Sequence, residues 1–89
     1  MYELIIDKKI TKFTIKQDKP TQKRIKDILL ELAENPFSRR LDIVKFAGYR
    51  FHYRVRIGDI RIIYEVKNKE LIVHVLDINN RGQIYKRWT

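Results

Sequence analysis

The chain has 89 residues, a mass of 10.9 kDa and a formal net charge of +9, with a sequence pI near 10.0. This length favours one domain, over residues 1–89, and leaves no room for a large cofactor cavity, so we expect no cofactor. The absence of Cys excludes disulfides and thiol chemistry, and two isolated His residues do not make a metal site. The cationic excess favours an anionic partner, with nucleic acid first, although it also keeps a small protein soluble.

We expect neither a membrane span nor a targeting segment. The longest apolar stretches, such as Leu71–Leu76, are far shorter than the roughly 20 residues that a spanning helix needs. Residues Met1–Asp7 contain acids and no cationic stretch, so they do not resemble a signal peptide. These features favour a cytoplasmic protein.

The chain is expected to begin with a short strand and a first helix. Leu4–Ile6 is a run of aliphatic residues of strand length. Asp7 follows it and is a suitable N-cap for a helix with Ile10 and Phe13 on one face.

A longer second helix is the clearest element of the sequence. Pro20 suits its first turn, and Pro36 ends it. Its apolar residues recur at spacings of three and four, at Ile25, Ile28, Leu29, Leu32 and Ala33. The two helices are expected to pack antiparallel, joined near residues 18–20.

The second half of the chain changes to a period of two, which is typical of strands. Phe51–Ile57 and Ile60–Val66 alternate apolar and polar residues about a two-residue turn, Gly58-Asp59. Leu71–Leu76 is apolar on both faces apart from one His, as in a central strand, and Leu41–Phe46 is a weaker candidate. The order predicts an α+β fold, with a short N-terminal strand, a two-helix hairpin, and a three- to four-stranded antiparallel sheet with helices on one face.

The hairpin carries arginines that the turn brings together. A two-residue loop places Arg56 opposite Arg61, with Arg54 on the same face and diagonal to Arg61. Like charges that face each other across strands are destabilising, so this grouping favours an anionic ligand. Two alternatives remain open: the arginines splay apart in solvent, or they pair with acids elsewhere in the chain.

The C-terminal segment adds a cation and a phenol four residues apart, Arg81 and Tyr85. If this segment returns over the cationic face, four arginines surround a phosphate, beside a tyrosine able to stack on a base or to move a proton. Alternatively, Tyr85 closes the edge of the core. Trp88 is expected to pack, or to belong to a flexible tail, rather than to take part in chemistry.

Three further residues near the hairpin are candidates for RNA contact. Lys45 and Arg50 belong to the arginine-rich stretch, and His52 lies on the polar face beside Arg54. His74, on the central strand, is expected to be a hydrogen-bonded structural residue.

The hairpin and the C-terminal segment resemble the RelE–ParE toxin superfamily. Residues 45–66, KFAGYRFHYRVRIGDIRIIYEV, are similar to its core pattern L-x-G … Y-R-V-R-V-G-D-Y-R-V-x-Y-E-V. The ending NRGQIY, residues 80–85, is similar to its closing H-R-x-x-V-Y, with Asn80 where many relatives have His. With the helix pair, the resemblance covers nearly the whole chain and implies a RelE-like fold.

RelE-type members of this superfamily cut messenger RNA in the ribosomal A site. The resemblance implies a ribosome-dependent endoribonuclease with a catalytic set of Arg54, Arg56, Arg61, Arg81 and Tyr85. In this scheme the ribose 2′-OH attacks the adjacent phosphate. Tyr85 is the base, the hairpin arginines hold the phosphate, and Arg81 stabilises or protonates the leaving oxygen.

The same resemblance implies partners and leaves rival functions. The expected partners are the ribosome, messenger RNA and a cognate antitoxin, which would hold the toxin inactive in a hetero-oligomer by covering the cationic face with an acidic or amphipathic segment. One alternative is a ParE-like inhibitor of DNA gyrase that cuts nothing. The other is an RNA-binding domain without catalysis.

Overall fold

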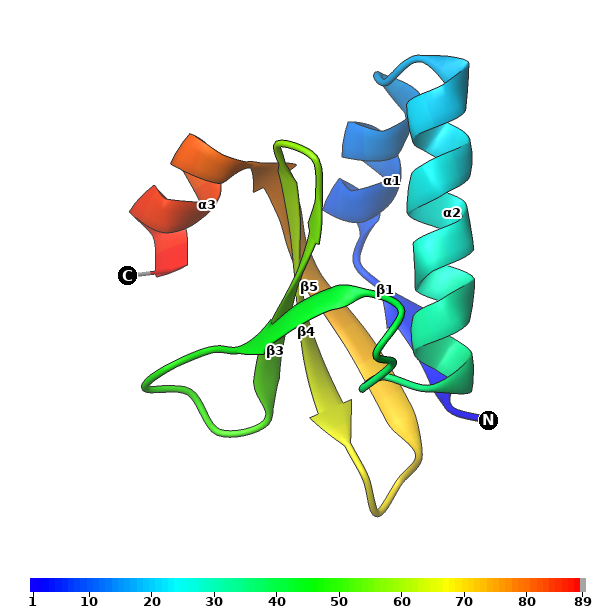
Figure 1. Cartoon of the computed structure of the whole chain (residues 1–89), viewed down its shortest axis with the longest axis vertical. Coiled ribbons are helices and arrows are strands. Elements are labelled where there is room, and N and C mark those ends of the chain that lie inside the picture. The colour runs from blue at the N-terminus through cyan, green and yellow to red at the C-terminus, as the bar shows by residue number, and fades with distance from the viewer. Residues whose placement is uncertain (89) are drawn as a thin grey trace.

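The fold is built on one five-stranded sheet, seen in Figure 1 in a computed structural model that describes residues 1–88. The strands lie in the order β1-β5-β4-β3-β2 across the sheet. In chain order the elements are β1 (Glu3–Ile6), α1 (Lys8–Ile15), α2 (Lys19–Glu34), β2 (Asp42–Lys45), β3 (His52–Ile57), β4 (Ile60–Lys67), β5 (Ile72–Asn80) and α3 (Arg81–Trp88). The predicted order of elements and the α+β class are confirmed.

Helices cover both faces of the sheet. α1 and α2 lie against one face, and α3 lies against the other (Figure 1). β1 pairs in parallel with β5, whereas the other neighbours pair antiparallel, so the sheet is mixed. The prediction of a purely antiparallel sheet with helices on one face therefore differs from the structure in two respects. It did not include β1 as a parallel strand of the sheet, and it did not include the helix α3 on the other face. The segment of α3 buries a single residue, Ile84, and so lacks the apolar period that identifies a helix.

The two N-terminal helices begin in different ways. Asp18 caps α2, because its Oδ1 accepts a hydrogen bond of 2.9 Å from the backbone N–H of Thr21. Asp7 occupies the N-cap position of α1 but makes no side-chain cap bond. Its Oδ1 lies instead 2.9 Å from Nε2 of His74, so the start of α1 is tied to β5. No helix of residues 1–88 is both long and apolar enough to cross a membrane.

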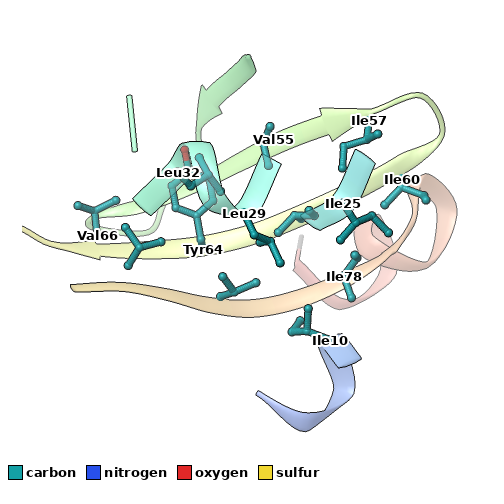
Figure 2. Packing of buried hydrophobic residues seen from close by; sticks show 13 residues of the cluster. Ile10, Ile25, Leu29, Leu32, Val55, Ile57, Ile60, Tyr64, Val66 and Ile78 are labelled. Carbon is teal, nitrogen blue, oxygen red and sulfur yellow. The ribbon is translucent and has the colours of Figure 1, made fainter. Parts of the chain in front are cut away.

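The main core lies between the helix pair and the sheet, and Figure 2 shows its packing. The predicted apolar face of α2 supplies Ile25 and Leu32, both fully buried. From the sheet, Tyr64 is also fully buried, and its hydroxyl donates a 2.7 Å hydrogen bond to the carbonyl of Pro36. Tyr64 therefore joins β4 to the segment that follows α2, through both its ring and its hydroxyl.

The strand register determines which residues face α3. In the hairpin, Arg56 pairs with Arg61 and Ile57 with Ile60, as predicted. Between β4 and β5 the register shifts at Ile63/Tyr64, where Ile63 pairs with Asp77. Paired residues share a face, so this β-bulge brings Asp77 to the same side as Ile63, opposite the main core.

Candidate active site

A phenol on α3 lies between two guanidinium groups, one from β3 and one from α3 itself. Arg54 Nη1 donates a 3.2 Å hydrogen bond to the Tyr85 hydroxyl, and the Arg54 Cζ lies 5.8 Å from the Tyr85 ring centroid. The Cζ of Arg81 lies 5.4 Å from the same centroid. Arg81 is exposed, and the other two side chains are half-buried. We call these three residues the Tyr85 site; it brings together residues 31 positions apart in sequence.

The two cations change the acidity of the phenol. Hydrogen bonding from the Arg81 guanidinium, followed by the positive charge of Arg54, lowers the pKa of the Tyr85 hydroxyl below its ordinary value. Both groups favour the negatively charged phenolate, and the partial burial of the ring opposes them only in part. Tyr85 is thus easier to deprotonate than a free tyrosine, while its hydroxyl stays near solvent.

Arg56 pairs with an acid outside the hairpin. Its Nη2 lies 2.7 Å from Oδ2 of Asp42, the residue that faces it on β2. The side chain of Arg56 is 57% exposed, so the pair lies at the surface. One of the alternatives left open by the sequence, pairing with an acid elsewhere, is correct for this arginine.

Arg61 is buried and bonded to the backbone. It is 6% exposed, and its Nη1 donates to the carbonyls of Gly58 at 2.8 Å and Ile60 at 3.2 Å. Its Nε is buried and has no hydrogen-bond partner among residues 1–88. The prediction of one open cluster of Arg54, Arg56 and Arg61 is therefore wrong. Opposed guanidinium groups are each drawn to an acceptor of their own, one to a carboxylate and the other to the turn.

The three predicted RNA-contacting residues do not form a single cluster. Lys45 is exposed at the end of β2, and Arg50 is exposed in the following loop, with its Cζ 5.5 Å from the Phe51 ring. His52 is half-buried, and its Nδ1 lies 2.7 Å from the carbonyl of Arg50. Their roles stay predictions.

Sequence reasoning missed a group of residues that supports α3. The rings of Phe46, Tyr49, His52 and Trp88 pack together, with centroids 5.3–6.1 Å apart. We call them the aromatic cluster. Trp88 Nε1 also donates a 2.8 Å hydrogen bond to Asp77, which is 1% exposed. A lone acid in the apolar run of β5 was the signal that could have identified Asp77.

Residues 5–85 match the family model described as the ParE toxin of the type II toxin-antitoxin system, parDE. The chain belongs to this toxin family, within the RelE–ParE superfamily. The resemblance of the hairpin and the C-terminal segment to that superfamily is thereby confirmed. No match was found among curated proteins.

Solved RelE structures share the fold. A chain of the archaeal RelE-RelB complex from Pyrococcus horikoshii OT3 is 28% identical, with a TM-score of 0.81, over 92% of this chain and 97% of that one. A chain of the RelB-RelE antitoxin-toxin complex from Methanococcus jannaschii is 30% identical, with a TM-score of 0.75. The match covers 96% of this chain and 99% of that one. The isolated E. coli RelE toxin is 22% identical, with a TM-score of 0.73, and the match covers 98% of this chain and 94% of that one. This similarity shows that the two chains share a fold.

Proposed function

We propose that this toxin is an endoribonuclease that cleaves messenger RNA in the ribosomal A site. The Tyr85 site carries the proposal, because a half-buried phenol with a lowered pKa between two guanidinium groups is suited to proton transfer beside a phosphate. A pure binding surface has no need of an acidified phenol. The net charge of +9 favours the polyanionic substrate.

The proposed reaction uses the nucleophile that RNA itself provides. Tyr85, as phenolate, takes the proton of a ribose 2′-OH, whose oxygen forms a bond to the adjacent phosphorus while the bond from phosphorus to the 5′-oxygen breaks. The products are a 2′,3′-cyclic phosphate and a 5′-oxygen that takes up a proton. Arg54 and Arg81 stabilise the charge on the phosphate and on the leaving oxygen. Because an arginine side chain keeps its proton in proteins, Arg81 acts by its charge, and solvent supplies the final proton.

The two other hairpin arginines would contribute in different ways. The exposed pair of Arg56 and Asp42 is of a kind that typically contributes ~1 kcal/mol or less, so phosphate can replace Asp42 as the partner of Arg56. Arg61 donates a hydrogen bond to the carbonyl of Gly58 in the turn. The next residue of this turn, Asp59, accepts a 2.8 Å hydrogen bond from the backbone N–H of Arg81. In the free protein Arg61 thus supports the start of α3, and binding phosphate requires it to leave these carbonyls.

We also propose that a cognate antitoxin binds this toxin. Two of the similar solved structures are RelE complexes with RelB. An apolar groove lies between α1, α2 and β1, and it includes Ile15 and Leu30, 65% and 51% exposed. Lys26 also lines this groove. An amphipathic antitoxin helix with an acidic residue facing Lys26 fits this apolar groove.

A ParE-like action on DNA gyrase is the second candidate, and the matched family model favours it. In that case the chain would inhibit gyrase and leave RNA intact. A third candidate, RNA binding without cleavage, would give neither effect.

One assay separates the three candidates. The purified chain is incubated with translating ribosomes, the message ends are mapped, and gyrase supercoiling is measured in parallel. We expect cuts within A-site codons, with gyrase unaffected. Arg54→Ala should lower the cleavage rate by about 10- to 1,000-fold, because one preorganised charge is lost. Lys23→Ala, which removes an exposed cation on the distant face of α2, is the matched control and should cleave as the unmodified chain does.

Two results would contradict the proposal. Gyrase inhibition without RNA cuts would favour the ParE-like candidate. Ribosome or RNA binding without either effect would favour the binding domain.

A further inference from the structure

The position of the Tyr85 site depends on one short helix. α3 has eight residues and carries both Arg81 and Tyr85. A helix of this length is unstable in isolation, so contacts with the rest of the protein must fix it. Its first turn is bound by the hydrogen bond from the Arg81 N–H to the Asp59 carbonyl. Ile84, in the middle of the helix, is buried. Trp88, its last residue, donates a hydrogen bond to Asp77.

The far end of α3 is attached to a buried carboxylate of β5. Oδ2 of Asp77 accepts the 2.8 Å hydrogen bond from Trp88 Nε1, and Oδ1 lies 3.4 Å from Arg87 Nη1. Oδ1 also accepts the backbone N–H of Ile78 at 2.9 Å and lies 3.8 Å from Lys9 Nζ. The cations around Asp77 are about half-exposed, whereas its own side chain is 2% exposed. A carboxylate this deeply buried is tolerated because each oxygen has a partner.

Asp77 is not placed to act as a base. Both of its oxygens are occupied, and burial leaves no path for a ribose hydroxyl to reach them. Trp88, in turn, is fixed on a second side by the aromatic cluster, since its ring lies 5.5 Å from the Tyr49 ring and 5.9 Å from the Phe46 ring. Tyr85 lies three residues before Trp88, on the same side of the helix.

We propose that Asp77 and Trp88 form a latch that fixes the end of α3 and thereby holds Tyr85 beside Arg54. Asp77 is then a positioning residue, which acts on the Tyr85 site through Trp88. The latch is a property of the free protein. Only its consequence for RNA cleavage rests on the proposed function.

The acidity of Tyr85 reports its position, because the lowered pKa depends on the two guanidinium groups beside it. We propose to follow the pH titration of the tyrosine Cζ signals by ¹³C NMR in the purified chain, with Tyr85→Phe to assign the Tyr85 signal. Trp88→Phe keeps an aromatic ring in the cluster, changes no charge and removes the bond to Asp77. Asp77→Leu removes the carboxylate with an apolar side chain of similar length. Gln83→Ala, an exposed neutral change on α3, is the control.

The latch predicts that the Tyr85 midpoint rises towards that of a free tyrosine in Trp88→Phe and in Asp77→Leu, and that it stays unchanged in Gln83→Ala. A purely electrostatic role of Asp77 predicts the opposite sign, because removal of a nearby negative charge favours the phenolate. An unchanged midpoint in Trp88→Phe, or a lower one in Asp77→Leu, would overturn the latch. If Asp77→Leu does not fold, as judged by circular dichroism, Trp88→Phe alone decides.

Cleavage assays give the second readout. If the toxin cleaves RNA, Trp88→Phe should lower the rate by about 10- to 100-fold, since small displacements of a reacting group have effects of this size. If the toxin proves to act on gyrase, the NMR result still decides whether the latch exists. The two proposals therefore fail separately.

Discussion

Replacing Tyr85 by Phe should lower RNA cleavage on translating ribosomes by about 100- to 10,000-fold, the range in which a general base contributes. The substitution removes one oxygen and keeps the ring that lies against Arg54 and Arg81, at 5.8 and 5.4 Å from their Cζ atoms. The lost function is then the proton transfer, and binding should remain. Single-turnover cleavage and co-sedimentation with ribosomes measure the two separately.

The matched control for this substitution is Tyr2→Phe. The hydroxyl of Tyr2 bonds to the exposed Asn68 side chain, near the start of β1 and outside the Tyr85 site. It should cleave as the unmodified chain does. Near-normal cleavage by Tyr85→Phe would show that the phenol is not the base, and equal loss in both variants would point to damage of the fold.

The second large effect concerns stability. Tyr64→Ala should lower the free energy of unfolding by about 3–5 kcal/mol, because it opens a cavity in the middle of the core and leaves the Pro36 carbonyl without its donor. Proteins of this size are typically stable by only about 5–15 kcal/mol, so the variant should be partly unfolded at moderate temperature. Urea unfolding followed by circular dichroism measures the change.

Tyr64→Phe separates the ring from the hydroxyl. It removes only the 2.7 Å hydrogen bond to Pro36 and should cost about 1–2 kcal/mol, including the unsatisfied carbonyl. Equal costs for the two variants would show that the hydroxyl, and not packing of the ring, dominates at this position.

Local rules account for the part of the fold that the sequence predicted. Pro20 and the spacing of Ile25 and Leu32 predicted the α2 helix, and this prediction is confirmed. The two-residue turn Gly58-Asp59 predicted the hairpin and the pairing of Arg56 with Arg61, which are also confirmed. The parallel pairing of β1 with β5 joins residues about 70 positions apart, which no local pattern specifies.

The candidate site was predicted less completely, because side-chain partners depend on tertiary contacts. Arg54, Arg81 and Tyr85 do come together, since α3 returns over the sheet. Arg56 and Arg61 do not join them, because a carboxylate from β2 binds Arg56, and the backbone carbonyls of Gly58 and Ile60 bind Arg61. An alternating pattern of side chains specifies neither the Asp42 carboxylate nor the backbone carbonyls that accept from Arg61.

The support of α3 escaped prediction for a related reason. Asp77 faces α3 because a β-bulge shifts the register of β5, and such a shift leaves no mark in an alternating pattern. Of the two expectations for Trp88, packing or a flexible tail, the structure shows packing, with a hydrogen bond to Asp77 that the sequence did not predict.

The pH dependence of single-turnover cleavage tests most directly whether Tyr85 acts as a base tuned by its arginines. In the proposed mechanism the phenolate is the active form, so the rate should rise with pH and level off near the Tyr85 pKa, which the guanidinium groups hold below its ordinary value. Arg54→Gln removes one of these charges and should move the break in the profile to higher pH, in addition to lowering the plateau. Profiles of the two proteins that break at the same pH would contradict the account.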